Sequence, residues 1–209
     1  VRTARTRFTN VSVDLMCGIP GQSEESFAES VRTAVSLGVA HVSVYPLTIE
    51  PHTPFDRAVL SGELPKPDED VQAAQMEAAE RILGKAGFAR YEVASYAKPG
   101  FECRHNISYW SGVAYLGLGK SAVTMTQNEE RRMRVQDGVV TDDLNPAQMA
   151  AEDLMLAMRM SRGVSEEQVA AAEHLLPNVR EAFAQLVRLG LVEHRNGCFR
   201  PTGQGWLCG

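Results

Sequence analysis

Residues 11–22 read Val-Ser-Val-Asp-Leu-Met-Cys-Gly-Ile-Pro-Gly-Gln, and this stretch decides the fold. Its apolar, β-branched first half predicts a strand that carries one carboxylate, Asp14. Gly18-Ile-Pro-Gly21 then predicts a sharp turn, and Ser23 with the two glutamates after it predicts a capped helix start. A strand, a turn and a capped helix open a βα unit, the repeating element of parallel α/β folds.

A second strand is predicted at residues 41–47, where apolar and polar residues alternate up to Pro46. Between the two strands, residues 23–37 repeat apolar side chains at helical spacing and end at Gly38. A helix between two strands predicts a parallel pair with a right-handed crossover. Ligands bind at the carboxyl ends of such strands, so Asp14 is either a cofactor contact or a buried aspartate that fixes the following loop.

The chain from the second strand to residue 110 mixes loops with short elements. Residues 48–67 contain four prolines and predict a long loop, either substrate-binding or simply rigid. A long helix is predicted over residues 67–86, a third strand over 91–94, and irregular structure over 95–110. His41 lies at the start of the second strand, the stabilising end in barrel folds, and is expected to be structural.

The second half of the sequence changes from strands to helices. Residues 122–126 and the basic segment 131–135 predict strands, the second before a hairpin turn at Asp137-Gly138. The basic face of the second strand either contacts anionic groups or is the solvated face of an edge strand, which we favour. Helices are then predicted over residues 146–160, from 165 and over 179–189, with a hairpin over 191–202. Helices followed by a β-hairpin predict a winged-helix-like module, which we interpret as a lid or docking domain.

Composition and charge limit the class of protein. The 209 residues are 44% hydrophobic with a net charge of −5, which is typical of a globular chain and argues against a broad basic surface for nucleic acid. No apolar run reaches the roughly 18–20 residues of a membrane span. The four cysteines have no regular spacing, which favours free thiols in a reducing cytoplasm. Cys103 and His105 are two residues apart, but two ligands do not complete a metal site.

Several motifs resemble those of one known family, the oxygen-independent coproporphyrinogen III oxidases of the radical S-adenosylmethionine (SAM) proteins. The resemblance is to the oxidase-like branch that includes the haem chaperones, and it covers nearly the whole chain. The block His105-Asn-x-x-Tyr-Trp110 is typical of the chaperone-like branch, whereas Gly117-Leu-Gly-Lys-Ser-Ala122 is closer to the oxidase form. The subfamily therefore stays open. The resemblance rests on residues 13–22, 43–51, 91–110, 115–124 and 154–160.

The resemblance implies an α/β fold, with part of a radical SAM (TIM-like) partial barrel followed by an α-helical, winged-helix-like C-terminal domain. We expect the barrel portion at residues 1–126, a connecting hairpin or linker at 127–145 and the C-terminal domain at 146–209. Three strand–helix units are too few to close an eight-stranded barrel.

The resemblance also implies SAM and a 4Fe–4S cluster that three cysteines hold in a Cys-x-x-x-Cys-x-x-Cys loop, with the radical chemistry supplied by these cofactors. The implied activity is oxidative decarboxylation of coproporphyrinogen or, alternatively, haem binding and delivery to an acceptor protein without oxidase activity. This sequence contains no such cysteine loop. We therefore expect a partial cytoplasmic chain that is inactive alone and retains none of SAM, the cluster and haem firmly. We expect it to have neither a nucleic-acid partner nor a membrane span, and whether its parent is an enzyme stays open.

Residue by residue, the resemblance assigns two groups of contacts, with no catalytic residue and no metal ligand. The SAM contacts are Asp14 by identity, Thr48 and Val123 by position, and the glycines that shape the cofactor pocket, Gly18, Gly21, Gly117 and Gly119. The haem or porphyrin contacts are His105, Asn106, Tyr109 and Trp110.

Overall fold

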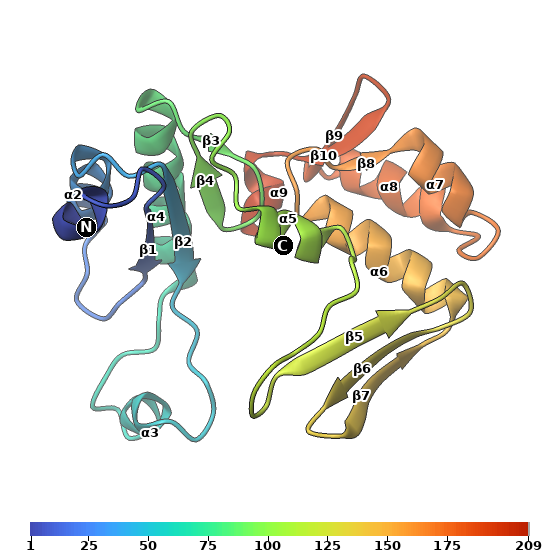
Figure 1. Cartoon of the computed structure of the whole chain (residues 1–209). Helices are drawn as coiled ribbons and strands as arrows, with labels where there is room; N and C mark the ends of the chain where they lie inside the picture. Colours follow the sequence, from blue (N-terminus) through green and yellow to red (C-terminus); the bar gives the residue numbers. More distant parts are fainter. Residues whose placement is uncertain (209) are drawn as a thin grey trace. The chain divides into compact units, whose positions relative to one another are not determined.

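The computed structural model describes residues 1–208, and the chain forms two compact mixed α/β units (Figure 1). The first unit comprises residues 1–102 and the second begins at Cys103. The first unit contains α1 (Arg2–Arg5), β1 (Ser12–Cys17), α2 (Glu24–Ser36), β2 (His41–Pro46), α3 (Pro54–Leu60), α4 (Glu69–Lys85), β3 (Ala89–Arg90) and β4 (Ser95–Ala97). The second contains α5 (Arg104–Trp110), β5 (Val123–Gln127), β6 (Arg132–Gln136), β7 (Val139–Leu144), α6 (Pro146–Met158), β8 (Val164–Ser165), α7 (Glu166–Ala172), α8 (Val179–Arg188), β9 (Val192–Arg195), β10 (Cys198–Pro201) and α9 (Gly203–Leu207).

The opening βαβ segment folds as predicted. Strands β1 and β2 are parallel, with Asp14 opposite Ser43 in register. Helix α2 begins at the predicted cap, where the Ser23 hydroxyl accepts a hydrogen bond from the Ser26 N–H at 3.1 Å. Helices α2 and α4 pack on one face of this sheet, and their apolar residues form a core with alternate residues of the strands. That core includes Val13, Leu15, Cys17, Phe27, Val31, Val42, Val44 and Leu83.

The third strand differs from the prediction. Residues 91–94 form no strand: Glu92 makes a single bridge and residues 93 and 94 form a bend. Strand β4 follows, antiparallel to both β2 and β3. The Tyr91 N–H donates to the Ser95 carbonyl, and the Ser95 N–H donates to the Glu92 carbonyl. These two local bonds close a turn, so residues 91–94 do not form the extended strand that Tyr91 and Val93 favour. The sheet order is therefore β1-β2-β4-β3.

Two helices lie where the sequence predicted loops. Helix α3 interrupts the 48–67 loop; Thr53 caps it by accepting from the Asp56 N–H at 3.1 Å, and Pro54 occupies its first turn. Helix α5 lies inside the segment predicted to be irregular. Its start is hard to read from the sequence because Cys103 makes no capping side-chain bond and the first turn has no acidic residue.

The second unit contains two small antiparallel sheets and a helical core. One sheet has the order β5-β6-β7 and the other β8-β10-β9. The hairpin turns lie at the predicted Asp137-Gly138 and Asn196-Gly197, where all four residues have positive φ. The predicted solvated edge strand is wrong, because β6 is the central strand of its sheet and Arg132 is only 2% exposed. Helices α6 and α7 begin with capping boxes at Asn145 and Ser165, as the polar residues there predicted.

The boundary between the two units lies at residues 102/103, whereas the predicted domain boundaries lie at 126 and 145. Residues 127–145 contain β6 and β7, which pair with β5 in one sheet. The division into domains by ancestry stays a prediction. No helix within residues 1–208 is both long and apolar enough to cross a membrane.

Candidate functional site

The face of the first-unit sheet opposite α2 and α4 carries polar side chains. Strand alternation places Ser12, Asp14 and Met16 on this face, and their partners in register are His41, Ser43 and Tyr45. Asp14 is exposed, as are Met16 and Tyr45 at 46% and 42%. We call this surface the open face; it offers a carboxylate in the middle and apolar side chains at the carboxyl ends of the strands.

At the amino-terminal ends of β1 and β2, hydrogen bonds between hydroxyl groups and an imidazole hold the side chains of the open face. Ser12 Oγ lies 2.8 Å from Nδ1 of His41, and the other ring nitrogen of His41 lies 2.8 Å from the Tyr91 hydroxyl. Burial lowers the pKa of His41, an effect that the negative charges of Asp14 and Glu92 partly offset. Burial therefore favours the neutral form of the ring, which lies between two hydroxyl groups. This is the structural role expected for His41.

Two amides of α4, Gln75 and Gln72, hold the loops that follow β1 and β2, and no sequence pattern indicated these bonds. The fully buried Gln75 accepts a hydrogen bond from the Gly18 N–H at 2.6 Å and donates to the Gln22 carbonyl at 3.1 Å. Gln72 donates to the Leu47 carbonyl, in the loop after β2, at 2.9 Å. Gly18 has φ +76°, and a side chain there would collide with Gln72. The turn after β1 is thus fixed against α4 by two side-chain bonds of Gln75, and the loop after β2 by one of Gln72.

The proposed SAM contacts are distributed over both units. The first unit holds Asp14 with Gly18 and Gly21, and Thr48 is exposed two residues beyond β2. The second unit holds Gly117, Gly119 and Val123. A side chain at Gly117 would collide with the Val123 carbonyl, so close backbone packing within this unit already accounts for a glycine at this position.

Helix α5 folds the block that carries the proposed haem contacts. His105 and Tyr109 are both exposed, and their spacing of four residues puts them on one face of the helix. Asn106 and Trp110 are half-buried. We call the exposed side with His105 and Tyr109 the ligand face of α5. Exposed imidazole and phenol side chains can ligate a metal and contact a planar ring system, respectively.

Aromatic contacts surround the end of α5. The Tyr109 and Tyr115 rings are stacked, with centroids 5.4 Å apart, and the Trp110 ring meets Tyr109 edge-on at 5.8 Å. The hydrogen bond with Tyr115, together with partial burial, raises the pKa of Tyr109. The Arg159 guanidinium lies over the Trp110 ring, 5.4 Å from its centroid. The Trp110 end of the aromatic cluster is therefore in contact with Arg159, the residue that follows α6.

An arginine–carboxylate network joins β6 to α6. Arg132 donates to Glu152 at 2.6 Å and to Asp153 at 2.7 Å, and Arg134 pairs with the same Glu152 at 2.9 Å. Burial works to raise the pKa of Glu152, but hydrogen bonds from Arg134 and Arg132 outweigh it and hold that pKa below its usual range. Arg134 also pairs with Asp142 of β7 at 3.3 Å, so the network joins both β6 and β7 to α6.

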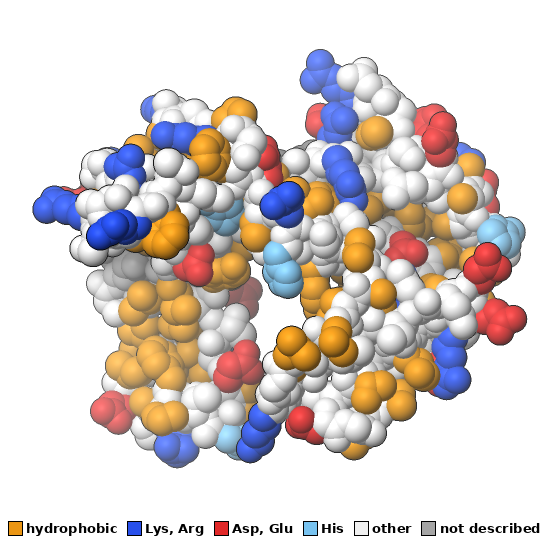
Figure 2. Space-filling model, viewed as in Figure 1, with side chains coloured by type: hydrophobic (Ala, Val, Ile, Leu, Met, Phe, Trp, Pro, Cys, Tyr) orange, Lys and Arg blue, Asp and Glu red, His pale blue; other side chains and the backbone are white. Residues whose placement is uncertain are grey.

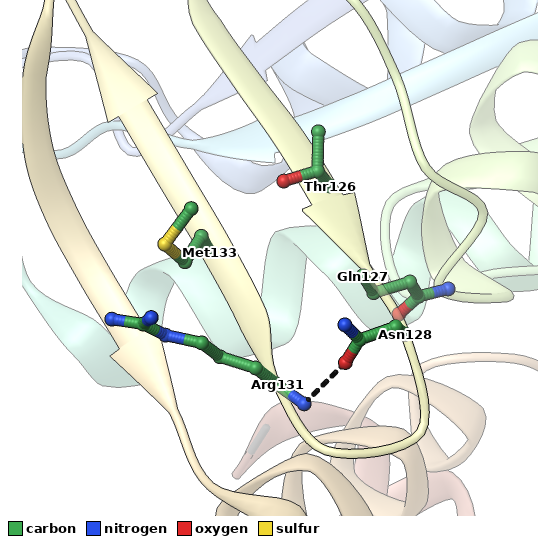
Figure 3. Close-up of a pocket in the computed structure, with 5 residues that line it drawn as sticks. All are labelled: Thr126, Gln127, Asn128, Arg131 and Met133. Atoms are coloured by element: carbon green, nitrogen blue, oxygen red, sulfur yellow. Dashed lines mark hydrogen bonds between the residues drawn. The ribbon is translucent and has the colours of Figure 1, made fainter.

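The turn between β5 and β6 encloses a small surface hollow of about 140 Å³ (Figure 3). In it, the Arg131 N–H donates to the Asn128 side chain at 2.8 Å, and the Arg131 guanidinium pairs with Asp143 of β7. Thr126, Gln127 and Met133 complete the lining. Pockets for drug-sized ligands measure about 300–1,000 Å³, so this hollow is too small to be the candidate site.

Within residues 1–208 no three His, Cys, Asp or Glu side chains converge as metal ligands. The residues described here therefore do not fit a 4Fe–4S cluster, and the pair Cys103 and His105 stays incomplete as a metal site.

On the face drawn in Figure 2, basic, acidic and hydrophobic side chains are intermixed.

The fold is similar to about half of one solved coproporphyrinogen III oxidase. The structure matches coproporphyrinogen III oxidase (HemN) from Escherichia coli, described as a radical SAM enzyme, with a TM-score of 0.68 and 18% identity; the match covers 98% of this chain and 54% of that one. Residues 144–208 match the model of the HemN C-terminal domain family.

The sequence is also similar to proteins named heme chaperone HemW. The relative from Mycobacterium tuberculosis (strain CDC 1551 / Oshkosh) is 35% identical over 96% of this chain and 53% of its own length. The relative from Bacillus subtilis (strain 168) is 31% identical over 100% of this chain and 59% of its own length. This chain belongs to the HemN/HemW family. It spans about half the length of the curated relatives that it matches.

Proposed function

We propose that this chain binds haem on the ligand face of α5 and that it serves a haem chaperone, a protein that delivers haem to an acceptor protein. The observation that carries the proposal is the exposed pair His105 and Tyr109, one helical turn apart on α5. The relatives named heme chaperone, 31–35% identical over nearly the whole chain, support delivery above oxidation.

Each residue of the block has a role in this proposal. The His105 imidazole, exposed to solvent, ligates the haem iron through a ring nitrogen, the commonest protein ligand for haem. The Tyr109 ring contacts the macrocycle, and Asn106 and Trp110 are the less exposed members of the contact set. A single protein ligand on an exposed helix leaves the other side of the iron open. An acceptor protein can then take the haem without displacing a second ligand.

The open face supports a second proposal, a site for SAM. The fit rests on Asp14, an exposed carboxylate where no helix covers the sheet, and on Met16 and Tyr45 as apolar neighbours at the strand ends. Asp14 and Thr48 would bind the polar groups of SAM, and Gly18 and Gly21 would shape the turn beside it. Gly117, Gly119 and Val123 belong to the second unit, and their assignment to SAM rests on the family resemblance alone. We derive no step through a cluster.

We also propose how the two parts of the chain relate to known folds, a radical SAM partial barrel and a winged helix. The parallel β1–α2–β2 segment is the unit from which a radical SAM partial barrel is built, with its open face toward the barrel interior. Helices α6 to α8, followed by the β9–β10 hairpin that pairs with β8, have the element order of a winged helix. We infer that residues 1–126 derive from the barrel, 127–145 connect and 146–209 form the C-terminal domain.

Haem titration followed by transfer tests the proposed function. We expect the chain to take up one haem, with a shifted Soret band, and to lose it when apomyoglobin is added. Absence of a saturable one-to-one spectral change would overturn haem binding. Failure to transfer haem would favour the oxidase alternative if the protein that contains this chain also decarboxylates coproporphyrinogen.

Equilibrium dialysis with labelled SAM tests the open-face proposal. We expect Asp14→Asn to weaken SAM binding and Glu29→Gln, an exposed carboxylate on α2, to leave it unchanged. Equal binding by both variants would contradict a role for Asp14.

A further inference from the structure

We propose that the groove between α8 and the β9–β10 hairpin binds a small aromatic molecule that carries an anionic group. The groove lies within the second unit (Figure 1), is lined by residues of α7, α8, β9 and β10, and has a volume of about 420 Å³. Pockets for drug-sized ligands measure about 300–1,000 Å³, so this groove has room for such a molecule. The proposal does not depend on haem binding at α5.

Two stacked rings form a flat apolar wall of the groove. The His194 ring of β9 is stacked on the Phe199 ring of β10, with centroids 4.2 Å apart and an angle of 14° between the planes. Phe199 also packs against the buried Phe183 of α8, with centroids 4.7 Å apart. The His194 side chain is 38% exposed, so its ring is accessible from solvent. An aromatic ligand can therefore stack on a ring pair that is anchored in the core of the second unit.

Helix α8 contributes both charge and apolar surface to the groove. Its lining residues follow the i, i+4, i+7, i+8 spacing of a single helix face, and they are Arg180, Ala184, Val187 and Arg188. The two arginines are thus about 12 Å apart along the helix axis, with the two apolar residues between them. An aromatic body that covers Ala184 and Val187 places its anionic group within reach of a guanidinium.

Glutamates pair with the two arginines, but these pairs are exposed. Arg180 binds Glu173 through Nε, and Arg188 binds Glu181 through one terminal nitrogen at 2.7 Å. All four side chains are at least 40% exposed, and such pairs are weak in water. Because a guanidinium has several N–H donors, both arginines keep donors for the anionic group of a ligand.

Glu166 of α7 determines which way the ligand faces. Its carboxylate lies 2.8 Å from Nε2 of His194 and also lines the groove. An anionic group beside His194 would meet this negative charge, whereas an anionic group beside α8 meets the positive charges of the arginines. The ligand therefore stacks its aromatic part on His194 and turns its anionic group toward α8.

Titration of the chain with anilinonaphthalene sulfonate tests the proposal. This probe has an aromatic body and one sulfonate, and its fluorescence rises when it leaves water. We expect one saturable site per chain. The double variant Arg180→Gln/Arg188→Gln should weaken binding about 10-fold, because a charged hydrogen bond is lost. Phenylnaphthylamine, the same molecule without the sulfonate, should bind this variant and the native chain equally.

Matched controls keep the probe to the groove. Arg131→Gln/Arg195→Gln removes two exposed arginines of the second unit that do not line the groove, and it should leave binding of the sulfonate unchanged. Val187→Glu should weaken that binding at least about 10-fold through loss of apolar contact and repulsion, whereas Val140→Glu, at an exposed valine of β7, should not. Far-UV circular dichroism checks that each variant is folded.

The outcomes separate clearly. Loss of sulfonate binding that is confined to the groove variants, in folded chains, supports the proposal. Absence of a saturable site in the native chain overturns it. Equal affinities in the two double variants, or in the two valine variants, place the probe outside the groove and also overturn it. An equal loss for the neutral probe in Arg180→Gln/Arg188→Gln overturns recognition of the anionic group by these arginines.

Discussion

The open face of the first unit and the α5 cluster of the second are held by different kinds of interaction. On the open face, hydroxyl and imidazole groups meet in neutral bonds, such as those of His41 with Ser12 and Tyr91, and the adjoining turn is held by the amide of Gln75. Around α5, the deciding contacts are charged, with Arg132 and Arg134 sharing Glu152. The two sites should therefore fail in different ways. A substitution in the first leaves a buried backbone amide without its hydrogen-bond partner, and a substitution in the second leaves a carboxylate without its counter-charge.

The largest expected effect comes from breaking the charged network. Arg132 is 2% exposed. Its removal leaves Glu152 paired with Arg134 alone and removes the ion pair of Asp153 with Arg132. Breaking a buried pair costs about 3–5 kcal/mol, and because Asp153 is half-exposed we expect Arg132→Met to lower the free energy of unfolding by about 3 kcal/mol. Urea unfolding followed by tryptophan fluorescence measures it, because Trp110 and Trp206 both lie in the second unit.

Arg131→Met is the matched control for this prediction. Its pair with Asp143 is exposed to solvent, so we expect Arg131→Met to change the free energy of unfolding much less than Arg132→Met does. Equal losses in the two variants would show that burial of Arg132 carries no energetic weight.

A smaller effect is expected from the neutral site. Gln75→Leu keeps the approximate volume but leaves the buried Gly18 N–H and the Gln22 carbonyl without their partner. An unsatisfied buried group costs about 1–3 kcal/mol, so we expect a loss near 2 kcal/mol in the first unit. Hydrogen exchange of the amides in β1 and α4 measures it, with Gln72→Leu, which loses a single bond, as the milder comparison. Protection that is equal in both variants would contradict the role given to Gln75.

The smallest effect is a difference in acid sensitivity. Burial lowers the pKa of His41 in the folded chain, so its neutral form is favoured there and protonation favours unfolding. The penalty is absent above the ordinary histidine pKa of about 6.5 and grows as the pH falls below it. The pKa of Glu152 is also lowered, so its stabilisation is present above about pH 4.3 and is lost as the pH falls through the folded value.

We therefore expect the first unit to lose protection at a higher pH than the second. Hydrogen exchange of β1 and β2 reports on the first unit, and tryptophan fluorescence reports on the second. His41→Gln should remove the step below pH 6.5. Loss of both units at one pH, unaffected by this variant, would contradict the assignment to His41.

Local rules account for the parts of the fold that the sequence predicted. The cap at Ser23, the alternation in β2 and the turns at Asp137-Gly138 and Asn196-Gly197 depend on neighbouring residues, and each lies where the pattern indicated. Segment 91–97 depends on which backbone groups bond across a turn, and its strand lies later than predicted.

The contacts around the candidate sites depend on residues distant in sequence. The basic segment of β6 looks solvated in the sequence because the carboxylates that pair with it lie on α6, 20 residues away for Arg132 and Glu152. The amide of Gln75 is 57 residues from the Gly18 N–H that it binds. Such pairs carry no periodic signal. The α5 block was found through family resemblance alone, since its helix has no capping signal.

The central claim, that α5 presents a haem ligand, is tested most directly by titrating haem into the chain and into His105→Ala. The control is His174→Ala, which removes another exposed histidine of the second unit. Loss of outer contacts to a metal ligand already costs about 10–100-fold, so loss of the ligand itself should weaken binding at least about 10-fold and move the Soret band, whereas His174→Ala should bind as the native chain does. Unchanged affinity and an unchanged spectrum in His105→Ala would contradict the account.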